Sequence, residues 1–206
     1  ELYQSPLLPP SFIAAALSSG TALVILVIVG VFRLAGRPLD DRLVVGLGRL
    51  LAVFILVVLY FVFVENASRV YLHESRRAAL YFLFGGVHSA LFWGGLVGIG
   101  SIVPALILFN GRTGESVPWI VFSSVVTVIG VFCERYVIVI PGLTHPPDLF
   151  PGMEISSSVI EEGVVSYSIS LHEVLQALGV VGVIGLLFIL GLKLLRLLPT
   201  EAKIAV

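Results

Sequence analysis

The chain has 206 residues, of which 58% are hydrophobic and only 12% are charged, and its formal net charge is -1. Soluble domains carry roughly 25% charged residues, so this composition indicates an integral membrane protein and gives no support to nucleic-acid binding. The single cysteine, Cys133, excludes an internal disulfide, a zinc knuckle and a cysteine-ligated iron-sulfur cluster.

Several apolar runs reach the roughly 20 residues that a helix needs to cross a bilayer, and none shows the alternation of a transmembrane β-strand. We therefore expect an all-α membrane protein: one transmembrane domain over residues 1–206, with a four-helix bundle and a final fifth helix. The predicted spans are residues 11–34, 43–64, 88–109, 118–140 and 174–198. The chain opens on Glu1 without an initiator Met, so we expect it to be part of a longer polypeptide.

The second and third spans carry features that call for specific packing. Arg49 lies about two turns inside the second span, and we expect it to snorkel or to meet Asp40 or Asp41. A polar link over residues 65–77 follows, and then residues 78–109 are too long for one straight crossing. We predict a short interfacial helix over residues 78–84 before the third span. Within that span, Gly94-x-x-x-Gly98 predicts a close helix contact and Pro104 predicts a kink.

The fourth span carries Glu134 and Arg135 near its end. A charge at the middle of a bilayer costs on the order of 3 kcal/mol, so such residues need an interface, a protein neighbour or a partner. Adjacent residues point about 100 degrees apart on a helix, so these two cannot simply neutralise each other, and each needs a partner from another segment. Ser124 and Thr127 share the face of Glu134 and would begin a proton path, although such hydroxyls more often bond back to their own helix.

The distribution of basic residues predicts that the N-terminus lies outside and the C-terminus inside. In that orientation the inner links and tail hold Arg33, Arg37, Arg42, Arg112, Lys193, Arg196 and Lys203. The outer side holds Arg69, Arg76, Arg77 and Arg135. The long link over residues 141–171 is then an outer loop, and we expect it to dock an extrinsic subunit.

Most of the remaining polar residues then gather at the outer surface. The candidate site residues are Glu65, Arg69, His73, His88, Glu134, Arg135 and His145, with Ser124 and Thr127 below Glu134. Such a cluster fits a quinone headgroup, which needs hydrogen-bond donors and a proton carrier at the membrane boundary. An ion-pair network that only locks the helix ends fits equally well. A haem held between His88 and His172 is a weaker alternative, and we predict no metal site.

Three stretches of the chain resemble the NrfD/polysulfide reductase family of membrane subunits. They are residues 8–20 (LPPSFIAAALSSG), residues 92–98 (FWGGLVG) with Pro104, and residues 134–142 (ERYVIVIPG). Residues 167–173 and the glycine-rich last span are similar to that family's closing segment. The resemblance covers nearly the whole chain and corresponds to the later half of the long, ten-helix form of the family.

The resemblance implies a subunit in a prokaryotic cell membrane that binds no cofactor of its own and uses menaquinone or ubiquinone as a diffusible substrate. It implies an iron-sulfur, ferredoxin-like partner on the outer face, which feeds a molybdopterin or multihaem cytochrome subunit. The quinone pocket of the long form is usually assigned to the earlier bundle, which gives Glu134, Arg135 and His88 a structural or proton-transfer role here. A non-redox membrane anchor or a transporter-like bundle remains the alternative from another class.

The orientation is tested by cysteine labelling in intact cells, with Cys133 replaced by Ala. We expect a membrane-impermeant thiol reagent to modify a cysteine placed at Glu161 and to spare one placed at Arg37, because the basic links stay inside. Labelling at Arg37 without labelling at Glu161 would reverse the predicted orientation.

Overall fold

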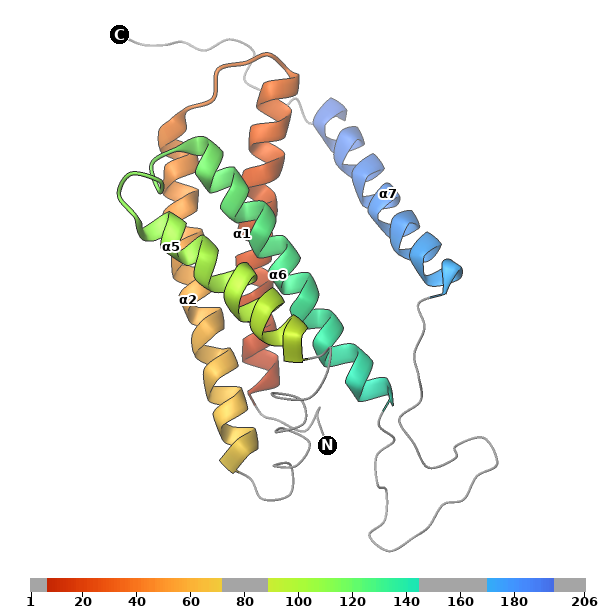
Figure 1. The fold of residues 1–206 in the computed structure, drawn as a ribbon. Coiled ribbons are helices and arrows are strands. Elements are labelled where there is room, and N and C mark those ends of the chain that lie inside the picture. The colour runs from red at the N-terminus through yellow and green to blue at the C-terminus, as the bar shows by residue number, and fades with distance from the viewer. Residues whose placement is uncertain (1–6, 72–88, 145–169, 195–206) are drawn as a thin grey trace, which may run out of the picture. The chain divides into compact units, whose positions relative to one another are not determined.

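The computed structural model describes residues 7–71, 89–144 and 170–194, with the backbone alone at residues 69 and 140–144. The regular structure in these ranges is helical (Figure 1), and five of the described helical segments are long and apolar enough to cross a membrane. The all-α prediction with about five spans is therefore confirmed. The chain divides into two compact units, Glu1–Val164 and Val165–Val206, which are described separately.

The first unit contains a four-helix bundle. Its elements are α1 (Leu8–Leu34), α2 (Asp41–Tyr71), the π-helix η1 (Leu91–Ile102) with its continuation α5 (Val103–Phe109), and α6 (Val117–Thr144). Helix α1 packs on α2 and α6, while η1 and α5 complete the ring by packing on α6 and α2. If η1 and α5 are taken together as one helix, successive helices of the bundle run in opposite directions (Figure 1). The described part of the second unit is α7 (Leu171–Leu194), which is apolar over most of its surface.

The turn from α1 to α2 is built from local capping. Gly36 adopts a φ of 63°, a left-handed conformation that glycine enters without steric cost. The Gly36 and Arg37 amides then donate to the carbonyls of Arg33 and Phe32, at 3.2 and 3.0 Å, and so end α1. Asp40 begins α2, because its Oδ1 accepts a hydrogen bond from the Arg42 amide at 3.0 Å. A short link therefore returns the chain antiparallel to α1.

Several predicted boundaries and contacts differ in the structure. Helix α2 continues to Tyr71 instead of ending at residue 64, so Glu65 is helical and not part of a polar link. Helix α6 continues through Pro141 to Thr144, past the predicted end at residue 140. Of the two expectations for Arg49, the described residues show no ion pair with Asp40 or Asp41; its exposed side chain instead pairs through Nη2 with Oε1 of Glu115 at 3.5 Å. The predicted interfacial helix at residues 78–84 lies outside the described residues.

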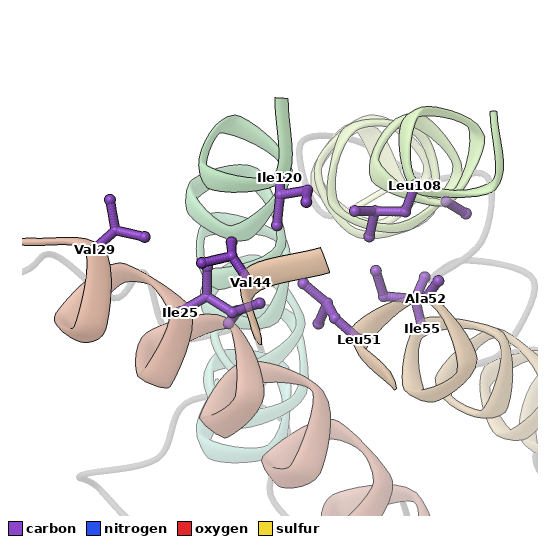
Figure 2. Packing of buried hydrophobic residues seen from close by; sticks show 10 residues of the cluster. Ile25, Val29, Val44, Leu51, Ala52, Ile55, Leu108 and Ile120 are labelled. Carbon is purple, nitrogen blue, oxygen red and sulfur yellow. The ribbon is translucent and has the colours of Figure 1, made fainter. Parts of the chain in front are cut away.

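Two apolar clusters fill the bundle at different levels. One joins α1, α2, α5 and α6, and Figure 2 shows its side chains converging between the helices. Its members are Ala22, Ile25, Val29, Val44, Leu51, Ala52, Ile55, Ala105, Leu108 and Ile120. The other lies toward the start of α1 and the end of α2 and comprises Ala14, Ala15, Val58, Val62, Phe92, Leu96 and Val137. This second cluster forms the apolar surroundings of the polar residues described below.

Helices η1 and α6 approach until their backbones touch at Gly100 and Gly130. A Cβ added to either glycine would overlap the backbone of the other, and a Cβ on Gly95 would lie 2.9 Å from Sγ of Cys133. The expected contact through Gly94 and Gly98 is wrong, since a Cβ on Gly94 meets nothing and one on Gly98 meets only its own helix. The reason is the winding: π-helical i to i+5 bonding brings Gly95 and Gly100 onto one face. Near Pro104, where we expect a kink, the winding changes from π to α.

This contact predicts the effect of adding one methyl group. Gly100→Ala should destabilise the protein by about 1–3 kcal/mol, because the methyl group overpacks the backbone contact with Gly130. Gly94→Ala is the matched control, with the same change on the same helix in open space. Denaturation of the purified protein in detergent measures both. Equal stability of the two variants would contradict the backbone contact.

Candidate functional site

The candidate site lies on the inner face of α6, where Glu134 follows Gly130 by four residues. Residues four apart share a helix face, so the close approach at Gly130 turns Glu134 into the bundle. The Glu134 side chain is only 4% exposed. Its Oε2 atom is fully buried and makes no hydrogen bond in the described part of the chain. A carboxyl group left this way carries a desolvation cost that no donor among the described residues offsets at that oxygen.

Arg135 leaves the same turn of α6 but points to α1. Its guanidinium carbon lies 3.7 Å from the centre of the Phe12 ring, a cation-π arrangement. Its Nη2 also donates to the Phe12 carbonyl oxygen over 3.5 Å, which is long, so the stacking is the stronger of the two contacts. The prediction that this charge needs a partner from another segment is confirmed. The buried Nη1 atom has no hydrogen-bond acceptor among the described residues.

A second carboxyl group enters from α2. Glu65 is 6% exposed, and its helix packs on α6. The next residue, Asn66, donates through Nδ2 to the Val62 carbonyl at 2.7 Å, while its buried Oδ1 has no donor in the described part of the chain. Two helices that pack on each other, α2 and α6, thus each bury one carboxyl group.

The two predicted hydroxyls on α6 are buried and bond to their own helix. Ser124 donates to the Ile120 carbonyl and Thr127 to the Ser123 carbonyl, each at 2.8 Å. This is the usual behaviour of such residues in membrane helices. Ser123 is also completely buried, and its hydroxyl lacks a partner in the described ranges. Both hydroxyl protons are thus donated to backbone carbonyls in this structure. A proton path through Ser124 and Thr127 stays a prediction.

The remaining predicted residues are not brought into this site by the described structure. Arg69 lies on α2 with only its backbone described, while His73, His88 and His145 lie outside the described residues. His172 is exposed on the first turn of α7, in the second unit. The described residues contain no group of three metal-ligating side chains. The haem alternative, which needs His88, is not tested.

Sequence reasoning missed Phe12 and Asn66. Phe12 carries no polar group, so only the approach of α1 to α6 reveals it as the partner of Arg135. Asn66 was placed in a polar link, and it became a half-buried helical residue only because α2 continues past residue 64. The signal for Asn66 was its position beside Glu65 after a long apolar helix.

Comparison with known proteins shows several relatives. Residues 1–147 match the family model described as polysulphide reductase, NrfD. The chain is 38% identical to the Hdr-like menaquinol oxidoreductase integral membrane subunit of Archaeoglobus fulgidus, over 98% of this chain and 52% of that protein. It is 30% identical to a selenate reductase subunit of Mesobacillus selenatarsenatis, over 71% of this chain and 34% of the relative. It is 28% identical to a putative dimethyl sulfoxide reductase membrane subunit of Halobacterium salinarum, over 94% of this chain and 46% of that protein. The chain thus spans about half the length, or less, of these relatives.

The stacking of Arg135 on Phe12 predicts a measurable stability difference. Phe12→Leu should cost at least the ~0.5–2 kcal/mol of a cation-π contact, and Phe12→Tyr should largely retain it. Phe63→Leu is the matched control, because Phe63 is 74% exposed. Unfolding free energies in bicelles provide the measurement. If Phe12→Leu cost no more than Phe63→Leu, Arg135 would not be held by this ring.

Proposed function

Since this chain belongs to the polysulphide reductase NrfD family, we propose that it is part of the integral membrane subunit of a quinol-linked oxidoreductase. It is a multi-pass integral membrane protein, as its five apolar helices and its family agree. The names of its relatives support the proposal, since they are subunits of a menaquinol oxidoreductase, a selenate reductase and a putative dimethyl sulfoxide reductase.

In this proposal the subunit exchanges electrons between the quinone pool and an iron-sulfur partner subunit on the outer face. The name of one relative favours menaquinol as the electron donor over ubiquinol. A molybdopterin or multihaem subunit would complete the complex, in keeping with the selenate and dimethyl sulfoxide reductase names. The membrane subunit anchors this assembly, and the quinone exchanges its protons beside it at the membrane surface.

The bundle contributes the proton chemistry. Oxidation of a quinol releases protons as well as electrons, so a proton acceptor is needed within the membrane part of the complex. The observation that carries this role is the buried Glu134 Oε2 with no hydrogen bond in the described structure. Structural carboxylates in apolar surroundings are normally paired or hydrogen-bonded, whereas a proton carrier must have an oxygen available. Arg135 leaves that oxygen available because it stacks on Phe12.

The test is Glu134→Gln in the complete complex. The amide keeps the size of the side chain but cannot carry a proton, so we expect normal assembly and quinol turnover slowed by roughly 100-fold. Turnover and proton release are measured in proteoliposomes, and copurified subunits are identified by mass spectrometry. Glu115→Gln is the matched control, because Glu115 is largely exposed and pairs with Arg49.

The same preparation separates the alternatives. If Glu134 only balances a buried charge, its loss costs about 3 kcal/mol, and assembly falls while the assembled fraction turns over normally. Normal yield, normal turnover and normal proton release together would exclude both roles.

A further inference from the structure

The guanidinium of Arg135 is held by one residue of α1. Its carbon atom lies 3.7 Å from the centre of the Phe12 ring, and its Nη2 donates to the Phe12 carbonyl oxygen over 3.5 Å. The hydrogen bond goes to the backbone, which any residue at position 12 supplies, and it is long. The ring contact depends on the aromatic side chain, so a substitution at Phe12 removes the stronger of the two contacts.

The neighbouring residue has the complementary need. Glu134 is 4% exposed, and its Oε2 has no hydrogen-bond donor in the described structure, while the buried Nη1 of Arg135 has no acceptor there. A guanidinium only donates hydrogen bonds and a carboxylate only accepts them. The two side chains leave the helix about 100 degrees apart, so they meet only if the long arginine side chain bends back along α6. The contact with Phe12 holds the guanidinium against α1 instead.

Few other titratable groups lie on the helices packed around this site. Helix α1 carries only Arg33, at its other end, and η1 and α5 carry none. At the end of the bundle that holds Glu134, α6 adds Cys133 and Tyr136, and α2 adds Glu65 and Arg69, the latter with its side chain not described. Glu65 is buried and makes further interactions. It is therefore left unchanged in every variant below, so that its influence on Glu134 stays constant.

We propose that Phe12 is a positioning residue for Glu134: its ring holds the Arg135 guanidinium against α1 and so leaves the Glu134 carboxyl group free to take up and release a proton. Without the ring, the guanidinium bends back to the unpartnered oxygen of its neighbour. A charge-assisted hydrogen bond of that kind favours the ionised carboxylate over the protonated acid. The use of this arrangement in turnover rests on the function proposed above, whereas the arrangement itself is tested without turnover.

The experiment is infrared spectroscopy of the resting complex in lipid, which detects the C=O stretch of a protonated carboxyl group. Loss of a band in Glu134→Gln assigns it to that residue, and the band is followed over the pH range in which the complex stays intact. At the pH where the wild-type band has half its full height, we expect Phe12→Leu to lose it and Phe12→Tyr to retain it, because tyrosine still offers an aromatic face. Phe63→Leu is the matched control, since Phe63 is 74% exposed.

A double variant separates positioning from a general loss of packing. Arg135→Gln removes the charge through which Phe12 acts, so in that background Phe12→Leu should have no further effect on the Glu134 band. A residue that only fills space would lower the band equally with and without the arginine. Phe12→Met replaces Phe12→Leu if the leucine variant does not assemble, because it also removes the ring but fills more of its volume.

Three results would overturn the proposal. One is a band that Phe12→Leu leaves unchanged or strengthens, and another is an equal loss in the Arg135→Gln background. The third is a wild-type complex in which no band is assigned to Glu134 at any pH, because the site would then never take up a proton. Normal turnover in Glu134→Gln would exclude the proposed function alone, since the band is measured at rest.

Discussion

The backbone contact between Gly100 and Gly130 is the constraint on which the rest of the bundle depends. It brings η1 against α6 more closely than any side chain would permit and fixes the rotation of α6 about its axis. Cys133 then lies against Gly95, and Glu134, four residues beyond Gly130, turns inward. Lipid offers no hydrophobic force between helices, so small residues that allow close packing have to supply this association.

The inward rotation of α6 divides its polar residues into two kinds. Ser124 and Thr127 are buried at little cost, because each donates to a carbonyl of its own helix. Glu134 cannot be satisfied in this way, since a carboxylate only accepts hydrogen bonds and the carbonyls of a helix do not donate them. A buried acid at this place therefore needs either a partner or a proton, and its Oε2 finds no hydrogen-bond partner in the described structure.

Glu134 and Arg135 are adjacent in the sequence, but their side chains lie in different surroundings. Arg135 lies over Phe12 and so fastens α6 to α1, while Glu134 faces the interior. A salt bridge between them would have closed the site by supplying Glu134 with a permanent partner. The stacking on Phe12 leaves the Glu134 carboxyl group without a salt bridge to Arg135, as the proposed role of Glu134 as a proton carrier requires.

The sequence by itself determined the helices and the presence of a buried polar site, because the cost of moving a segment into lipid depends on local composition. It therefore located all five apolar helices, and it identified Glu134 and Arg135 as residues that need an explanation. Only the tertiary structure decided the contacts between helices. The glycine contact moved from Gly94 and Gly98 to Gly95 and Gly100 because η1 is π-helical, and no composition rule reports that winding. Likewise, Glu65 became a buried helical residue because α2 continues past residue 64 and packs in the bundle, a contact between segments that hydropathy does not measure.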